Sequence, residues 1–439
     1  MDRRSFIIAA GSALGSGLAK PSASLGKDRA GRAAAAMQTP PSWSAVRAQF
    51  NLAPDRVHLA AFFLASHPRP VRLAIERHRR GFDLDPFGYW DENVDPCEEA
   101  VLKAAKEYLG ADPEEISLTD STTMGLGILY GGLRLRAGQQ ILTTEHDHYA
   151  THTSLDLRAR RDGATVRRIP LYEDPEKASA NEMADRLVRA VTPKTRLVAV
   201  TWVHSVSGVK LPIRQIADML AKVNASRDEA DRVLLGVDGV HGFAAEETDV
   251  KRLGCDFLVA GCHKWLFGPR GTGIVWGKAA AWPNAYPTIP TFDGRSYDIW
   301  THEAPEAPVP MAAQMTPGGF HSFEHRWALE EAFRFHQSLG KSRVAARIHE
   351  LNRSFKEGLR GIRNVRLRTP LSDEVSSGIS CFEVGGLKPD DVVDRLAKKK
   401  IVATVTPYAI KYARASFSVI NSPQDVEVTL RALREIAGA

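Results

Sequence analysis

The sequence predicts an α/β fold in which a large domain holds a mostly parallel central sheet and a smaller α+β domain follows. Between about residues 115 and 277, short apolar segments alternate with amphipathic segments of about 10–15 residues, which is the pattern of βαβ units. Polar residues gather where the apolar segments end, and ligands bind at that edge of such sheets. From about residue 321 a long helical segment opens a second region that runs to Ala439.

The predicted elements follow one another with few interruptions. Ahead of the sheet we expect a helix at 41–52, an extended piece at 57–63, a charged helix at 69–84, an aromatic loop (FGYWDE) at 87–92 and a helix at 97–110. The predicted strands are 115–121, 139–145, 165–171, 196–203, 233–240, 256–262 and 274–277. The predicted helices among and after them are 122–133, 147–163, 180–191, 213–225 and 323–340. Residues 286–319 are Pro-rich and irregular, and long loops of this kind are typically functional.

The same pattern divides the chain into three parts. Residues 1–40 are predicted to be a signal and linker, residues 65–320 a large domain, and residues 41–64 together with 321–439 a small domain. A chain of 439 residues with 44% hydrophobic content is long enough to form both cores.

The N-terminal residues indicate export. Arg3 and Arg4 precede a short apolar stretch that is diluted with Gly and Ser, and this stretch is too short and too weakly apolar to span a bilayer. The run RRSFI resembles a twin-arginine signal, which a receptor reads on proteins that are exported folded. A flexible tail with two arginines is the alternative. The signal predicts a periplasmic protein that uses the twin-arginine export machinery and whose mature form does not enter the membrane.

Composition argues against several classes of site. The net charge of +6 is spread along the chain, and the longest basic run is KKK at 398–400, so we expect no nucleic-acid partner. The four cysteines, Cys97, Cys255, Cys262 and Cys381, form no CxxC motif or other metal-ligand spacing. We therefore expect neither a disulfide framework nor a metal site.

Two charged residues stand in apolar surroundings. Asp238 ends the run VLLGVD, and Lys264 follows the run FLVAGCH. Burying either charge is costly unless the charge is paired or used chemically; the alternatives are a helix N-cap for the aspartate and a lysine that extends its aliphatic stem to the surface. Pyridoxal 5'-phosphate (PLP) needs groups of the kind found here: an acidic strand end, His241 three residues later and a lysine after the next strand. The lysine forms a Schiff base with the aldehyde of this cofactor, and the carboxylate pairs with its protonated pyridine nitrogen.

Two further strand ends supply the other groups that PLP needs. The phosphate needs N–H and hydroxyl groups at a helix N-terminus, and Thr122 and Thr123 open a Gly-containing helix. The ring needs a planar partner, and the segment TTEHDHYA offers His146, His148 and Tyr149. Each of these residues alone is typical of a helix cap or a surface position. Together, four junctions of one sheet supply what a single cofactor requires.

The run from Val237 to Gly273, VDGVHGFAAEETDVKRLGCDFLVAGCHKWLFGPRGTG, resembles the cofactor-binding core of class V aminotransferases. This fold-type I group of PLP-dependent transferases includes cysteine desulfurases and isopenicillin N epimerase-like proteins, and the resemblance extends over about residues 55–435. It implies that Lys264 is the Schiff-base lysine and the general acid/base, and that Asp238 pairs with the pyridine nitrogen. The full set of implied site residues is Lys264 and His148 for catalysis, Thr122, Thr123, His148, Asp238, His241, His263, Lys264 and Ser205 for the cofactor, and Arg414 for a substrate carboxylate.

The other roles also follow from the resemblance. His148 corresponds to the ring-stacking histidine, His241 to a residue near the ring hydroxyl, and His263 to a residue that reaches the phosphate. Arg414, in YARASF, corresponds to the arginine that clamps the substrate carboxylate, a task for which its forked donors are suited. An exposed arginine on a strand is the alternative for that position.

The sequence also departs from the family's pattern. The phosphate-binding serine usual three residues before the lysine is Gly261, and the asparagine of the desulfurase pattern is Ser205. The segment IVATVTPYAIKYA, at 401–413, holds no cysteine, whereas persulfide chemistry needs a nucleophilic thiolate on a mobile loop. Cys381 lies within the predicted strand GISCFEV and is expected to be packed. Cysteine desulfuration is therefore disfavoured.

The resemblance narrows the class of reaction but does not identify the reaction itself. The SFEHRWAL helix, the FGYW loop and the SHPRPV opening are similar to those of the isopenicillin N epimerase-like branch, and exported members of that branch resemble periplasmic enzymes that tailor a siderophore. We therefore expect transamination or related chemistry at the α-carbon of an amino-acid moiety, on a peptide-type secondary metabolite. The alternatives are an epimerase, a C–S lyase and a PLP-binding protein without turnover. The family also implies a homodimer, in which residues 286–319 lend groups to the partner's site.

Overall fold

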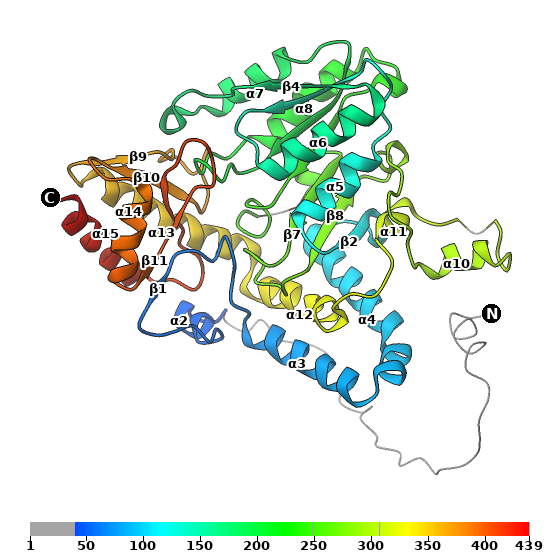
Figure 1. Ribbon diagram of the computed structural model, residues 1–439, viewed down its shortest axis with the longest axis horizontal. Helices are drawn as coiled ribbons and strands as arrows, with labels where there is room; N and C mark the ends of the chain where they lie inside the picture. The colour runs from blue at the N-terminus through cyan, green and yellow to red at the C-terminus, as the bar shows by residue number, and fades with distance from the viewer. Residues whose placement is uncertain (1–39, 248, 307, 439) are drawn as a thin grey trace.

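The computed structural model describes residues 40–247, 249–306 and 308–438 (Figure 1). The predicted twin-arginine signal lies outside the described residues. None of the helices in the described ranges combines the length and the apolar character needed to cross a bilayer.

A seven-stranded sheet occupies the middle of the chain. Its strand order is β2-β8-β7-β6-β5-β3-β4. Strand β8 is antiparallel to both of its neighbours, and the remaining pairs are parallel. The strands are β2 (Ile116–Thr119), β3 (Gln140–Thr144), β4 (Thr165–Ile169), β5 (Thr195–Thr201), β6 (Leu234–Asp238), β7 (Phe257–Gly261) and β8 (Gly273–Gly277). The mostly parallel sheet predicted from the alternating pattern is thereby confirmed.

Apolar side chains cover both faces of this sheet. In β5, Val198 and Val200 belong to one buried cluster and Leu197 and Ala199 to another, because successive side chains of a strand point to opposite faces. Helices pack over both faces, as the continuous burial of β5, β6 and β7 requires (Figure 1). The helices that connect or follow these strands are α5 (Thr122–Gly132), α6 (Tyr149–Asp162), α7 (Ala180–Arg189), α8 (Ile213–Asn224) and α9 (Val250–Leu253).

Three long helices pack together beside this sheet: α3 (Arg69–Leu84), α4 (Pro86–Leu109) and α12 (Phe323–Leu339). The prediction of a loop at FGYWDE is wrong, because these residues form the first turns of α4. Asp85 caps this helix by accepting a hydrogen bond from Gly88 N at 3.0 Å, and Pro86 occupies its first position. The aromatic side chains then pack against neighbouring helices; for example, the Tyr89 ring lies 5.2 Å from the Phe82 ring.

The C-terminal part contains a four-stranded antiparallel sheet of order β12-β13-β10-β9 and its own buried cluster. Its strands and helices are β9 (Val365–Leu367), β10 (Ser380–Val384), β12 (Thr404–Val405), β13 (Ala413–Ala415), α13 (Lys341–Arg360), α14 (Pro389–Lys398) and α15 (Pro423–Ala437). Strand β1 (Val57–His58) pairs in parallel with β11 (Ile401–Val402), so an N-terminal segment lies against this part. The domain boundaries near residues 65 and 320 stay a prediction.

The remaining elements are short. They are the α-helices α2 (Trp43–Arg47), α10 (Gly294–Trp300) and α11 (Met311–Met315), and the 3-10 helices η2 (Pro113–Glu115), η3 (Pro175–Lys177), η4 (Glu229–Asp231) and η5 (Trp282–Asn284). Helices α10 and α11 lie within residues 286–319, so that Pro-rich segment has more regular structure than its composition predicted.

Candidate active site

Asp238 and Lys264 come from adjacent strands at the carboxyl end of the large sheet. Asp238 is the last residue of β6, and Lys264 follows the end of β7 by three residues. The Asp238 carboxylate is buried and accepts hydrogen bonds from Val240 N at 3.0 Å and from the Thr151 hydroxyl at 3.4 Å. Both donors are neutral, so the carboxylate can still pair with a cation.

Burial perturbs both charges, and each charge acts on the other. Burial raises the pKa of Asp238 to about 6, although the hydrogen bond from Val240 and the charge on Lys264 act in the opposite direction. Burial lowers the pKa of Lys264 to about 8, although the Asp238 carboxylate opposes this change. Lys264 is therefore closer to its neutral, nucleophilic form at neutral pH than an exposed lysine is.

Two predicted histidines lie near these charges. His148 caps α6, where its Nδ1 accepts a hydrogen bond from a backbone N–H two residues on, at 3.2 Å. His241 is buried, and its Nδ1 accepts a hydrogen bond from Trp265 Nε1 at 3.4 Å. Burial, followed by the charges on Lys264 and Arg414, lowers the pKa of both histidines. Both rings are thus neutral at neutral pH and suited to packing against a planar ligand.

The N-terminus of α5 faces Gly261 and His263. Thr122 is the first residue of α5; among the described residues, neither its buried hydroxyl nor the buried Nδ1 of His263 has a hydrogen-bond partner. A Cβ on Gly261 would lie 3.0 Å from the Thr122 Oγ1 and 3.1 Å from the His263 Cε1, so glycine keeps a space open between these side chains. The first N–H groups of a helix lack intrahelical partners and carry partial positive charge. This cradle therefore suits an anion such as phosphate.

Arg414 reaches the site from β13 of the smaller sheet. It is buried, which excludes the alternative of an exposed arginine. Its Nε donates to Thr404 Oγ1 at 3.1 Å and its Nη1 donates to the Ser205 carbonyl at 2.9 Å, while its guanidinium carbon lies 4.6 Å from the centre of the Phe62 ring. Within residues 40–247, 249–306 and 308–438, no carboxylate forms an ion pair with Arg414. The buried guanidinium can therefore bind a carboxylate that a ligand brings.

Ser205 lies between Arg414 and a residue that the sequence did not single out, Tyr408. The two hydroxyl oxygens of Ser205 and Tyr408 are 2.7 Å apart. The Tyr408 ring is edge-on to the His148 ring, with the centroids 6.1 Å apart and the planes at 77°. The segment that holds Tyr408 stood out in the sequence only because it contains no cysteine, and nothing in its local pattern indicated that a tyrosine would enter the site.

The neighbours of His148 and Thr122 lie in different surroundings. The His146 ring stacks on Tyr172 at a centroid distance of 3.8 Å, and its Nε2 accepts a hydrogen bond from a backbone N–H at 3.1 Å. Tyr149 is 74% exposed, and the side chain of Thr123 is exposed in the first turn of α5. Of the three aromatic candidates in TTEHDHYA, the structure places only His148 beside Lys264.

Sequence reasoning also missed two buried polar residues next to the site. Thr151, in α6, donates to Asp238. The Asp147 carboxylate accepts hydrogen bonds from the Thr143 hydroxyl at 2.9 Å and from Thr144 N at 2.8 Å. The run of three polar residues, His146 to His148, directly after an apolar strand was the available signal for Asp147.

The cysteines are not placed for persulfide chemistry. Cys381 lies buried in β10, as predicted, and burial raises the pKa of its thiol to about 12. Over the described ranges, none of the four cysteines forms a disulfide, and no group of three His, Cys, Asp or Glu side chains is arranged to hold a metal ion.

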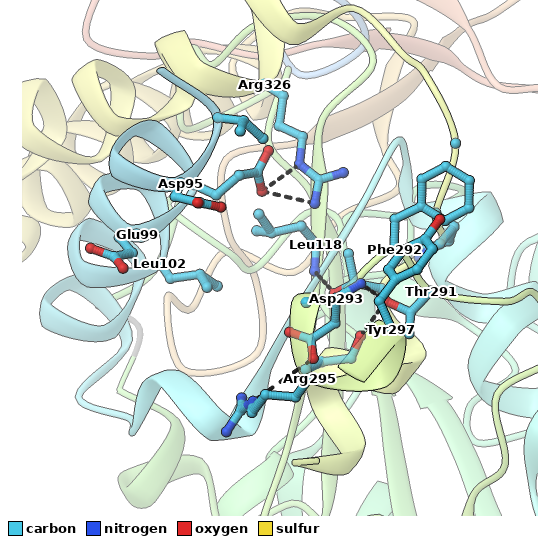
Figure 2. Close-up of a pocket in the computed structure, with 18 of the residues that line it drawn as sticks. Asp95, Glu99, Leu102, Leu118, Thr291, Phe292, Asp293, Arg295, Tyr297 and Arg326 are labelled. Carbon is cyan, nitrogen blue, oxygen red and sulfur yellow. Dashed lines mark hydrogen bonds and ion pairs between the residues drawn. The ribbon is translucent and has the colours of Figure 1, made fainter. Parts of the chain in front are cut away.

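A large cleft lies elsewhere. It has a volume of about 1570 Å³, and none of the predicted site residues lines it. Figure 2 shows Asp95, Glu99 and Leu102 of α4 on one side and Thr291 to Arg295 on the other. Carboxylates outnumber basic groups along its walls, which also carry aromatic side chains. Its size alone does not make it the active site, because the buried carboxylate of Asp238 and the Lys264 amine, whose pKa values are shifted toward each other, lie at the sheet edge.

The groups at the sheet edge fit PLP. An anion cradle, a buried carboxylate, a lysine with a lowered pKa and a neutral histidine are four features that suit this cofactor. Arg414 adds a receptor for a carboxylate. The arrangement is suited to chemistry at the α-carbon of an amino acid.

Comparisons with known proteins agree with this geometry. The family model described as Aminotransferase class-V matches residues 94–428. An isopenicillin N epimerase from Streptomyces clavuligerus is 25% identical over 353 residues, covering 78% of this chain and 84% of that protein. A protein of Haemophilus influenzae named as a probable cysteine desulfurase is 26% identical over 362 residues, covering 76% of this chain and 75% of that protein. Among solved structures, a C-DES mutant with glycine covalently linked to its PLP cofactor has a TM-score of 0.77 at 21% identity and covers 89% of this chain and 99% of its own.

Proposed function

This chain belongs to the class V aminotransferase family, and we propose that it is a PLP-dependent enzyme that acts at the α-carbon of an amino-acid moiety. Its fold is the α/β fold of fold-type I PLP enzymes. The proposal depends above all on one observation: a buried aspartate, a lysine with a lowered pKa and a phosphate cradle meet at one edge of the sheet.

Each part of the site has a partner on the cofactor. When bound, PLP supplies an electron sink that stabilises negative charge at the substrate's α-carbon. The Asp238 carboxylate would pair with the pyridine nitrogen, and the Lys264 amine would be the point of covalent attachment. Thr122 and His263 would bind the phosphate together with the N–H groups of α5, a task suited to their unpartnered buried atoms.

The histidines would orient the ring. His148 would stack against it, and the Tyr408 ring packs edge-on against His148. His241 would lie beside the ring hydroxyl, with its own orientation held by Trp265. Because both imidazoles are neutral, they add no further positive charge beside Lys264.

The substrate would be held by its carboxylate and would react beside Lys264. Arg414 would bind the carboxylate, because its buried charge has no acidic partner within the described residues. Lys264, once displaced by the substrate's amino group, would be the base that removes the α-proton and the acid that returns a proton. Its lowered pKa suits both roles at neutral pH.

Transamination or related chemistry at the α-carbon is the favoured reaction class. The alternatives are epimerisation, which is in the name of the Streptomyces clavuligerus relative, and C–S bond cleavage. Cysteine desulfuration with a protein persulfide is disfavoured, because burial holds the Cys381 thiol in its protonated form and the segment 401–413 contains no cysteine.

We further propose export and a peptide-type substrate. The run RRSFI supports passage through the twin-arginine machinery to the periplasm. A protein exported in its folded state can acquire its cofactor in the cytoplasm. A location outside the cytoplasm fits a secondary metabolite with an amino-acid moiety better than it fits central amino-acid metabolism.

A second copy of this chain is the proposed partner. Exposed aromatic side chains lie along the cleft between α4 and residues 291–326, including Phe87 (52% exposed), Phe292 (44%) and Phe320 (80%). Exposed apolar patches of this kind mark interaction sites. In the proposed homodimer, residues 286–319 lend groups to the partner's active site, so full activity in a monomer across a dilution series would disprove this part.

The function is tested by mixing the purified holoprotein with a panel of amino donors and following the cofactor's visible absorbance. Formation of a keto acid would identify transamination, an inverted α-carbon an epimerase, and pyruvate with sulfide a C–S lyase. The Lys264→Ala variant is the control, since it lacks the attachment point. A wild-type protein whose absorbance responds to no donor would be a PLP-binding protein without turnover, and the proposal would fail.

A further inference from the structure

Residues 406–412 form a loop that is closed at its base. Thr406 N donates to the Tyr412 carbonyl at 3.0 Å, and Tyr412 N donates to Thr406 Oγ1 at 2.8 Å. Between these two residues every position is exposed except Tyr408, which is half-buried. The loop therefore presents one side chain inward from a base that its own hydrogen bonds hold in place.

The phenol of Tyr408 points to the part of the site where a substrate would lie. Its hydroxyl is 2.7 Å from that of Ser205, and the Ser205 carbonyl accepts a hydrogen bond from Arg414. A single residue thus holds the phenol and the guanidinium side by side. Burial, against the opposing effects of Ser205 and Arg414, raises the pKa of Tyr408 to about 12, so the phenol keeps its proton at neutral pH and can act as a donor.

We propose that Tyr408 is a substrate-binding residue that holds the substrate's α-carboxylate together with Arg414. This inference rests on the proposed function. A carboxylate offers about four lone-pair sites, so it can accept from a guanidinium and from a phenol at the same time. Ser205 holds the phenol while no substrate is bound, and the phenol O–H turns to the carboxylate when one arrives. Before substrate binds, the hydrogen bond between Tyr408 and Ser205 keeps the phenol oriented, which limits the entropy lost on binding.

The test compares amino acids with the same molecules without their α-carboxylate. Wild-type holoprotein and Tyr408→Phe are titrated with L-alanine and ethylamine, and with L-glutamate and γ-aminobutyrate, while the cofactor's absorbance is followed. The expected result is a loss of about ten- to a hundredfold in the affinity for the amino acids and no change for the amines, as for a lost hydrogen bond to a charged group. Tyr412→Phe is the matched control: it is the same change in the same loop, on a ring that packs by the Arg368 guanidinium, 5.6 Å from the ring centre.

The outcomes separate this inference from the proposed function. If Tyr408→Phe lost equal affinity for the amino acids and the amines, the site would be generally disturbed and the carboxylate role would be overturned. The role would also be overturned if Tyr408→Phe bound all four ligands as tightly as the wild type does. The same amino-acid-specific loss in Tyr412→Phe would also overturn it. A wild-type holoprotein that responds to none of the four ligands and to no donor of the wider panel would overturn the proposed function itself, and the inference with it.

Discussion

The backbone N–H of Thr201 donates to the Asp147 carboxylate at 2.6 Å. This bond ties the turn before α6 to the end of β5, while the other carboxylate oxygen holds the end of β3. One buried side chain thus joins the ends of two neighbouring strands. Because Asp147 directly precedes His148, it determines where the proposed ring-stacking histidine enters the site.

Replacing Asp147 with asparagine is expected to loosen the cofactor. The Asp147 carboxylate accepts from its donors with two oxygens, whereas an amide has only one acceptor oxygen. At least one N–H or hydroxyl donor would therefore be left unsatisfied in the variant, at a cost of about 1–3 kcal/mol. We expect the dissociation constant of PLP, measured by equilibrium dialysis, to rise about tenfold in Asp147→Asn. Thr143→Val, which removes only one of the donors, is the matched control and should bind nearly as tightly as wild type. Unchanged PLP affinity in Asp147→Asn would contradict the positioning role.

The Lys264→Ala variant should lose the visible absorbance of the lysine-linked cofactor and keep its fold. Among the described residues, the Lys264 amine forms no hydrogen bond or ion pair, and alanine leaves the apolar neighbours in place. Absorbance spectroscopy of the reconstituted variant and its circular dichroism spectrum measure the two properties. Lys278→Ala is the control, because Lys278 also follows a strand of the same sheet, where it donates to the Gly254 carbonyl at 2.8 Å. If Lys264→Ala kept the absorbance of a linked cofactor, the attachment point would lie elsewhere.

The sheet and its strand ends could be predicted because their signals are local. A carboxylate at the end of VLLGVD and a lysine between apolar runs are each unusual enough to indicate a site, and the structure brings both to one edge. The alternation of strands and helices gave the mostly parallel arrangement. Helix α3 has the predicted bounds.

Features that depend on contacts between distant segments could not be predicted. Tyr408 lies about 200 residues from Ser205 along the chain, and only the folded structure brings their hydroxyl groups together. The aromatic run FGYWDE indicated a loop by composition, but its rings pack against Phe82 and Trp327 of other helices and are therefore stable within α4. In such places tertiary packing outweighs local preference.

The rate at which PLP attaches to the apoprotein should rise with pH and level off above about pH 8. The neutral amine is the nucleophile, and burial lowers the pKa of Lys264 to about 8, so the reactive fraction grows roughly tenfold per pH unit below that value. Stopped-flow absorbance after mixing apoprotein with PLP measures this rate. A rate that still rises steeply between pH 9 and pH 10 would indicate a lysine with an ordinary pKa and would contradict the prediction.

Glu246 is expected to make the fold sensitive to acid. Its carboxylate accepts from Lys210 at 2.8 Å, lies 3.0 Å from His349 Nε2 in α13, and accepts from the hydroxyl of Ser377 before β10. Burial raises its pKa, but the hydrogen bond from His349 and the charge on Lys210 outweigh this effect and lower the pKa to about 2. A carboxyl group whose pKa is lowered by folding stabilises the fold at pH values above its unfolded pKa, and this stabilisation is lost as the pH falls toward the folded pKa.

The Glu246→Gln variant tests this pH window. It keeps the shape of the side chain and removes its charge, so at pH 7 we expect the free energy of unfolding to fall by about 3 kcal/mol. Between about pH 4.5 and pH 2 the wild type should lose that advantage, and the two proteins should converge in stability, as measured by urea unfolding at a series of pH values. Glu247→Gln is the control, because Glu247 is the exposed neighbour of Glu246 and its pair with Arg252 is a surface pair at 3.6 Å, which contributes little. If the difference in unfolding free energy between wild type and Glu246→Gln stayed constant across this pH range, the prediction would be contradicted. The charge of the carboxylate would then not be what stabilises the contacts of the turn after β6 with α13 and with the segment before β10.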